Sequence, residues 1–364
     1  MKKILAIFTA AALMLCLAAC GGAQSSSSAS QPDNSSSSSA VSDSTSDSVS
    51  DSTSSSSSEA DSQSESQPSA GGDAASFHVG VIQLAEHPAL DAAREGFVDG
   101  LVAAGFSADN IEVQNAQGEI PNCAPIATKF VNDKVDLILA VATPAAQAAA
   151  QATTTIPILA TAVTDFVDSG LVESNDAPGG NVSGTSDMNP INEQADLLQQ
   201  LVPEAKTVGI LYCSAEDNSI LQADLAEAAF TERGLTVSRY TCSDVNDIQP
   251  VTTKAVGEVD VLYVPTDNLF AENMPTAAQI AEQAKIPVIC GEGNMVTSGG
   301  TATYGIDYYN LGKMAAEQAV EILVNGKDVA TVPVGFAAVE DLEFAINEEN
   351  CAAIGLEIPA ELKK

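Results

Sequence analysis

Short, mostly apolar runs recur from Phe77 onward, and stretches with helical periodicity separate them. The runs are 77–83, 135–139 and 156–159 in the first half and 206–212, 259–263 and 286–289 in the second. Continuous apolar runs of this length are typical of parallel strands that are covered on both faces of a sheet. Pro88 suits the first position of a helix over 88–105, and Gly105 suits its C-terminal cap.

The second half of this pattern repeats the first in the same order and at matching spacing. Val208 corresponds to Val79, Gly234 to Gly105, and the Ile-Pro pair at 286–287 to the pair at 156–157. Each copy predicts a strand–helix alternation that ends on a strand, which is typical of a doubly wound α/β fold. We therefore predict two consecutive doubly wound, parallel-sheet (Rossmann-like) lobes. The repeat argues against the alternative, a single large sheet.

The N-terminus has the features of an export signal. Lys2 and Lys3 precede an apolar run over 5–17, which is shorter than the ~20 residues needed to cross a bilayer. The sequence Leu17-Ala18-Ala19-Cys20-Gly21 resembles the lipobox of bacterial lipoproteins. That resemblance implies that residues 1–20 are a signal, that Cys20 carries a lipid, and that the protein is anchored on the extracytoplasmic face of the membrane. The alternative is an ordinary cleaved signal with an incidental cysteine.

Residues 21–76 form a serine-rich, acidic stretch with no Lys or Arg. Such a composition cannot bury enough apolar surface to offset the loss of chain entropy, so we predict a solvated, disordered tether. A glycosylated stalk is the alternative interpretation.

Composition then excludes several function classes. The net charge of −35 leaves little to neutralise phosphates, so we expect no nucleic-acid partner. The chain has two histidines, and the five cysteines after the signal have no metal-type spacing, so we expect no metal and no cofactor. Cys213 and Cys242 end two neighbouring predicted strands and could form a disulfide, but buried free thiols are the favoured interpretation.

The repeat also predicts where a ligand binds. In open parallel sheets, ligands bind outside the carboxyl ends of the strands, and two facing lobes would form a cleft from both sets of loops. These loops are largely polar, and residues from them form our candidate binding set. The set is Gln83, His87, Thr143, Pro144, Thr164, Asp165, Tyr212, Ser214, Asn218, Asp267, Asn268, Gly291 and Asp307.

Five segments in this region, taken together, resemble one family. They are 80–83 with 87–91, 142–147, 178–184, 214–219 and 264–268. The chain is similar to the ABC-transporter substrate-binding lipoproteins whose characterised members bind tryptophan, tyrosine or phenylalanine. The resemblance implies a type I periplasmic-binding fold with a three-segment hinge, an ABC permease as partner, and a monomer. The three crossings should follow 184–187, follow 304–307, and lie near 329–334. Lobe 1 would then comprise 77–188 with about 308–330, and lobe 2 would comprise 189–307 with about 331–364.

An amino acid ligand presents a carboxylate and an ammonium. Helix N-termini suit the carboxylate, so Thr143, Thr164 and Asn218 are candidates to hold it, although Thr143 and Ser214 would also serve as ordinary N-caps. Asp267 is our choice for the ammonium, with Asp165 and Asp307 as competitors.

An aromatic ligand also needs an apolar wall. Tyr212, Phe166, Phe270 and Tyr304 lie near strand ends and could supply it, or they could belong to the core. Gln83 and His87 could hydrogen-bond the ligand from the first lobe.

Other functions fit the sequence less well. We find no Gly-x-Ser-x-Gly elbow and no His-Glu-x-x-His motif, so we predict no enzyme activity. A ligand-sensing receptor domain on the same fold stays open. So does a different solute, such as a branched amino acid, a nucleoside or a sugar.

Overall fold

The computed structural model describes residues 73–338 and 342–363. Three sequence predictions therefore lie outside the described residues: the signal at 1–20, lipidation of Cys20, and the tether over 21–72. The tether was predicted to reach residue 76, and this was too far. Ala74–Ser76 form a 3-10 turn, and the Asn110 side chain donates to the carbonyl of Ala75, which fixes the turn against the first lobe.

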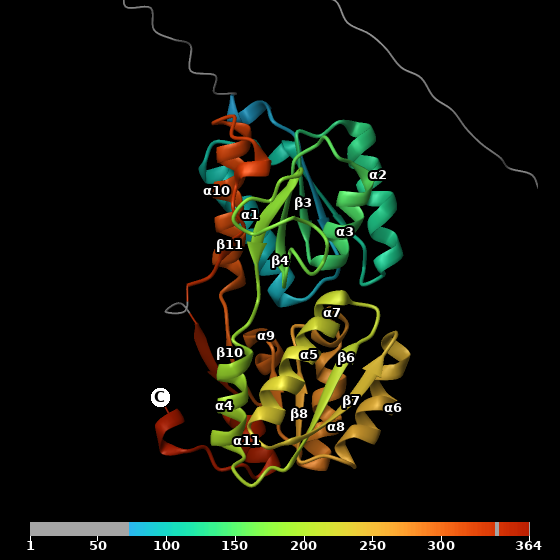
Figure 1. Cartoon of the computed structure of the whole chain (residues 1–364), viewed down its shortest axis with the longest axis vertical. Coiled ribbons are helices and arrows are strands. Elements are labelled where there is room, and N and C mark those ends of the chain that lie inside the picture. The colour runs from blue at the N-terminus through green and yellow to red at the C-terminus, as the bar shows by residue number, and fades with distance from the viewer. Residues whose placement is uncertain (1–72, 339–341, 364) are drawn as a thin grey trace, which may run out of the picture. The chain divides into compact units, whose positions relative to one another are not determined.

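The compact unit contains two six-stranded sheets, one in each lobe (Figure 1). In the first sheet all the strands are parallel. Its order is β11 (Gly335–Phe336), β5 (Val182–Ser186), β4 (Ile158–Val163), β3 (Leu137–Val141), β1 (Val79–Gln83) and β2 (Ile111–Asn115). Helices α1 (Pro88–Ala103) and α10 (Tyr308–Leu323) cover one face, and α2 (Cys123–Asp133) and α3 (Thr143–Ala152) cover the other.

The second sheet has the same organisation with one antiparallel edge strand. Its order is β12 (Glu343–Ile346), β10 (Ala302–Gly305), β9 (Val288–Cys290), β8 (Val261–Val264), β6 (Thr207–Cys213) and β7 (Thr236–Cys242). The helices of this lobe are α4 (Ile191–Leu201), α5 (Asp217–Glu232), α6 (Val245–Val256), α7 (Asn268–Glu272), α8 (Met274–Ala284), α9 (Gly293–Thr297) and α11 (Glu348–Ile354). The prediction of two doubly wound α/β lobes is confirmed.

Sequence patterns explain why these segments fold as they do. Every residue of β1, β3 and β4 is buried, as expected for central parallel strands. Pro88 occupies the first turn of α1, and that helix ends just before Gly105, which has a positive φ of 96°.

Helix α10 follows the second crossing, yet it packs directly on α1 of the first lobe. Glycine makes this close approach possible. A Cβ at Gly312 would lie 1.9 Å from the Ala93 carbonyl oxygen, and one at Gly96 would lie 2.0 Å from the Tyr309 carbonyl oxygen. The two helix backbones therefore touch, and α10 is fixed to the first lobe.

The chain crosses between the lobes three times. The first crossing follows β5 and the second follows β10, as predicted. The third lies between Phe336 and Glu343, later than the predicted 329–334, because β11 still belongs to the first sheet. Ser183 donates to the Val332 carbonyl and Gln318 to the Pro333 carbonyl, and these bonds hold the segment before β11 on the first lobe.

All five cysteines within the described part of the chain are buried and free. Cys213 and Cys242 are paired in register at the ends of β6 and β7 but form no disulfide, so the structure shows the favoured interpretation of free thiols. Burial raises the pKa of both thiols to about 12, which keeps them protonated.

Two other features, a membrane-spanning helix and a metal site, are absent from residues 73–338 and 342–363. No helix there has the length and apolar character to span a membrane. No group of His, Cys, Asp and Glu side chains there has the geometry of a metal site.

Candidate functional site

The loops after the strands of the two lobes face each other and enclose a small cavity. His87, Leu90, Ala162, Thr164, Asp187 and Tyr308 line it from the first lobe, and Asn218, Thr266, Asp267, Asn268, Ala271 and Glu292 from the second. Its volume is about 10 Å³, roughly the room that one water molecule needs. Ligand pockets are generally much larger, roughly 300–1,000 Å³, so the lobes must separate to admit a small-molecule ligand.

Hydrogen bonds join the lobes around this cavity. Gln222 Nε2 of the second lobe donates to Thr164 Oγ1 of the first at 3.0 Å. At the first crossing, Asn189 Nδ2 donates to Thr266 Oγ1 at 2.9 Å. His87 Nε2 lies 3.3 Å from Asn268 Oδ1. These contacts come from side chains that can rotate away, so a ligand can replace them without breaking a helix or a strand.

Several buried polar atoms on candidate site residues or near the crossings have no hydrogen-bond partner. They are His87 Nδ1, Thr143 Oγ1, Asn189 Oδ1 and Asn218 Oδ1, on residues whose exposed fractions are 6% or less. Unpartnered buried polar atoms are uncommon because each costs desolvation energy. Two of them, on His87 and Asn218, belong to side chains that line the cavity, and a third belongs to Asn189, which donates to Thr266 of the lining. These three indicate a site built to contact something polar.

One pair of buried carboxyl groups lies on the second-lobe side. Asp267 accepts from the backbone N–H groups of Cys213 at 2.5 Å and Phe270 at 2.8 Å. Glu216 accepts from Asn268 and Leu269. Burial, followed by the charge of Glu216, raises the pKa of Asp267 to about 7, and burial also raises the pKa of Glu216.

A second acidic group lies on the hinge side, where the first two crossings begin and end. Asp187 follows β5, and its carboxylate accepts from Thr164 Oγ1 at 3.2 Å and Tyr308 OH at 2.8 Å. Glu292 accepts from the backbone of Asn294 and Met295 at the start of α9. Burial raises the pKa of Asp187 to about 6 and that of Glu292 to about 7.

His87 contributes a neutral ring to the cavity wall. Burial lowers its pKa to about 4, against smaller opposing effects of Asn268 and Asp91. At neutral pH the ring is therefore uncharged and offers one donor and one acceptor. Because Nδ1 has no hydrogen-bond partner, one of these functions is unused.

The structure brings together five of the thirteen predicted site residues. Those lining the cavity are His87, Thr164, Asn218, Asp267 and Asn268. Thr143 is buried at the start of α3 with its hydroxyl unpartnered, and Pro144 follows it and instead lines a groove with α2.

The remaining six predicted site residues have structural roles or are exposed. Gln83 donates to the Ala85 carbonyl and Asp91, Asp165 caps the turn at 167–168, and Asp307 caps the N-terminus of α10. Tyr212 packs in the second-lobe core, and Ser214 is exposed. Gly291 permits a tight backbone approach, since a Cβ there would lie 2.3 Å from the Thr266 nitrogen.

The other aromatic candidates also belong to the core. Phe166 and Phe270 are fully buried in hydrophobic clusters, and Tyr304 packs on Phe344. The aromatic residue that does line the cavity with His87 is Tyr308, which the sequence set omitted.

Sequence reasoning missed four polar cavity residues: Asp187, Thr266, Glu292 and Tyr308. A usable signal existed for two of them. Asp187 ends the segment that predicted the first crossing, and Tyr308 directly follows the second. A site between two lobes lies beside the segments that join them, so residues at the crossings are candidates for the binding set.

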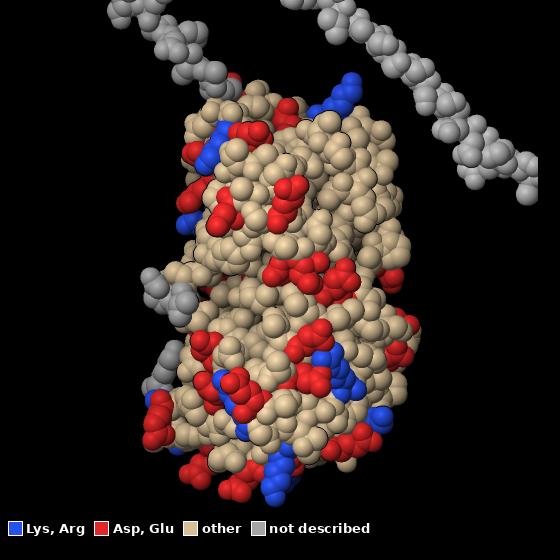
Figure 2. All heavy atoms as spheres, viewed as in Figure 1, with Lys and Arg blue, Asp and Glu red and all other residues tan. Residues whose placement is uncertain are grey.

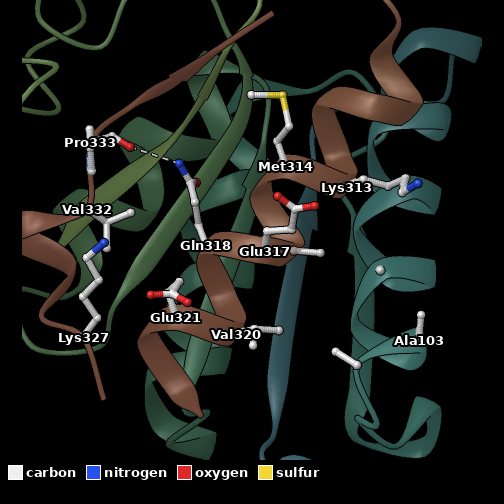
Figure 3. Close-up of a pocket in the computed structure, with 13 residues that line it drawn as sticks. Ala103, Lys313, Met314, Glu317, Gln318, Val320, Glu321, Lys327, Val332 and Pro333 are labelled. Atoms are coloured by element: carbon white, nitrogen blue, oxygen red, sulfur yellow. Dashed lines mark hydrogen bonds between the residues drawn. The ribbon is translucent and has the colours of Figure 1, made fainter. Parts of the chain in front are cut away.

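A more open cavity of about 710 Å³ lies elsewhere, between α1, α10 and the segment leading to β11 (Figure 3). Met314, Val320 and Val332 give it apolar walls, and Lys313 and Glu321 flank it. It is built by the first lobe alone and contains none of the predicted site residues. Because no described residue of the second lobe lines this cavity, a ligand bound there would not link binding to lobe closure.

Charge over the molecular surface agrees with the composition. Figure 2 shows that acidic side chains outnumber basic ones on the face in view, including along the boundary between the lobes. Burial, and then the like charges of Glu86 and Glu119 from the opposite lobe, raise the pKa of Glu272. Such a surface disfavours anionic partners.

Comparisons with known proteins agree with this architecture. The sequence profile of the family described as ABC transporter substrate binding protein matches residues 78–364. A protein of Clostridioides difficile (strain R20291) named tyrosine-binding protein is 44% identical over 283 residues, which are 77% of this chain and 81% of that protein.

Two solved structures place the fold in the same family. An ABC domain from Streptococcus pneumoniae in complex with L-Trp is 34% identical, covers 78% of this chain and 97% of its own, and superposes with a TM-score of 0.75. The ligand-free, open structure of a Clostridium difficile substrate-binding protein with adhesive properties is 44% identical, covers 78% and 96%, and superposes with a TM-score of 0.60. The chain belongs to the ABC transporter substrate-binding protein family.

Proposed function

We propose that this protein binds an aromatic amino acid in the interlobe cavity and delivers it to an ABC importer. The observation that carries the proposal is the cavity itself, where rotatable polar side chains from both lobes meet and where His87 Nδ1 and Asn218 Oδ1 are buried without partners. The tyrosine-binding relative and the neighbour in complex with L-Trp favour an aromatic ligand.

Lobe closure gives the mechanism. A ligand held by one lobe favours the closed arrangement by as much as its added contacts with the other lobe are worth. The superpositions support such a motion. The open relative superposes less well than the neighbour in complex with L-Trp, although its sequence is more similar to this chain. We attribute this difference to a more closed arrangement of the lobes here than in the open relative.

The polar groups of the ligand would replace the hydrogen bonds that join the lobes in this structure. We propose that His87, Thr164, Asn218, Asp267 and Asn268 surround it, and that Leu90 and Ala271 contact its ring. Thr143 and Thr164 provide hydroxyl donors for the carboxylate. The family is one of binding proteins, so no catalytic step is required.

The location follows from the family and the N-terminus. Proteins of this family act outside the cytoplasm, and we propose a lipid on Cys20 as the membrane anchor, with the protein acting as a monomer beside its permease. The sequence of the lipobox supports the anchor.

A thermal-shift screen of the purified protein against amino acids, nucleosides and sugars tests the ligand class. A ligand at 100 times its Kd stabilises the folded state by about 2.7 kcal/mol, which raises the melting temperature measurably. We expect tyrosine, tryptophan or phenylalanine to do so. A shift with sugars or nucleosides alone would contradict the proposal.

A further inference from the structure

Negative charge dominates the cavity and its border. Four buried carboxyl groups, those of Asp187, Glu216, Asp267 and Glu292, lie in or beside it. Its lining, as far as the described residues form it, includes no Lys or Arg. The ammonium of a bound amino acid would therefore be the positive charge that this cavity lacks, and one of these carboxylates must be free to receive it.

Three of the four carboxylates are committed to backbone donors. Asp267 and Glu292 each accept from two main-chain N–H groups, at distances of 2.5–2.8 Å, where α7 and α9 begin. Glu216 accepts from the main chain of Asn268 at 3.3 Å and Leu269 at 3.1 Å. Turning any of these carboxylates toward a ligand would leave buried N–H groups without acceptors.

Asp187 is arranged differently. Its side-chain partners are two hydroxyl groups, those of Thr164 and Tyr308. A hydroxyl rotates and can accept as well as donate, so both partners can turn and share an ammonium with the carboxylate. The backbone of Asp187 is meanwhile fixed, because its N–H donates to the Val163 carbonyl and its carbonyl accepts from Asn189.

We propose that Asp187, assisted by the Tyr308 hydroxyl, binds the ammonium group of the amino acid ligand. This inference rests on the proposed function and replaces Asp267 as the ammonium site. Glu292 adds negative charge nearby, and its effect is long-range because both of its oxygens stay on α9.

The position of this subsite also connects binding to closure. Asp187 lies at the start of the first crossing, and Tyr308 lies at the end of the second. Thr164, which donates to Asp187, in turn accepts from Gln222 of the second lobe. An ammonium at Asp187 therefore acts on the crossings and on one of the interlobe hydrogen bonds at once.

The test compares each aromatic amino acid with its analogue that lacks the amino group, by isothermal titration calorimetry on the purified protein. In the wild type we expect the amino ligand to bind roughly 10- to 100-fold more tightly than its analogue, as one charge-assisted hydrogen-bonded contact would give. In Asp187→Asn this preference should fall to about threefold or less. Affinity for the analogue should change little.

Glu292→Gln is the matched control, because both Glu292 oxygens accept from the start of α9, whereas Asp267→Asn tests the competing ammonium site. Melting temperatures of all the variants report folding. We expect Glu292→Gln and Asp267→Asn both to retain the preference for the amino ligand, because neither carboxylate can leave its backbone donors. The inference is overturned if Asp187→Asn weakens both ligands equally, or if Asp267→Asn abolishes the preference while Asp187→Asn keeps it. A wild type that binds no aromatic amino acid would overturn the proposed function and this inference with it.

Discussion

Replacing Asp267 with alanine tests whether its carboxylate has a structural role or binds the ligand. The side chain accepts from the N–H groups of Cys213 and Phe270, and the second bond caps α7. Each stranded buried N–H costs about 1–3 kcal/mol, and loss of an N-cap costs about 0.5–2 kcal/mol. Removing the Asp267 carboxyl also relieves its repulsion with the buried Glu216, and this offsets part of the loss in stability. We therefore expect Asp267→Ala to lower the free energy of unfolding by about 2–4 kcal/mol.

Urea denaturation followed by circular dichroism measures this loss. Asp267→Asn is the matched variant, because it keeps one acceptor oxygen and also removes the charge. We expect it to cost less than half as much as the alanine variant. An Asp267→Ala variant that unfolds within about 0.5 kcal/mol of the wild type, yet loses aromatic amino acid binding, would refute the reasoning, since surface-like substitutions fall in that range.

Three other substitutions test separate parts of the account. Gly312→Ala places a Cβ 1.9 Å from the Ala93 carbonyl oxygen and should cost about 1–3 kcal/mol in chemical denaturation, whereas Gly180→Ala, with no atom within 4 Å of its added Cβ, should not. Glu292→Gln removes a carboxyl whose folded-state pKa is about 7. Protonation of Glu292 stabilises the folded state fully below the pKa of the unfolded chain, and this contribution is lost as the pH rises through 7. The free energy of unfolding of the variant should therefore fall less than that of the wild type between about pH 5 and 8. Equal falls in the two proteins would contradict this. Cys20→Ala should abolish incorporation of labelled fatty acid in cells, and retained label would remove Cys20 as the anchor.

The repeated strand pattern was sufficient to predict both lobes. Central parallel strands are buried on both faces, so their apolar runs are conspicuous in the sequence, and Gly105 and Gly234 marked equivalent helix ends. The late third crossing was not predictable in this way. Strand β11 is two residues long, and hydrogen bonds from Ser183 and Gln318 hold the segment before it, which no local pattern records.

The site was predicted only in part for a related reason. Asp187 and Asp267 both follow strands, and the sequence alone makes them equivalent candidates. They differ in what their oxygens already bind, since Asp267 caps α7 whereas Asp187 meets two hydroxyls. One of those hydroxyls belongs to Tyr308, which reaches the cavity only because α10 returns to the first lobe.

The most direct test of the central claim is a calorimetric titration of the purified wild-type protein with tyrosine, tryptophan and phenylalanine. The account predicts saturable binding of at least one of them, with one ligand per chain and a negative heat-capacity change from apolar burial. No binding of any aromatic amino acid, with saturable binding of a sugar or nucleoside at the same stoichiometry, would contradict it.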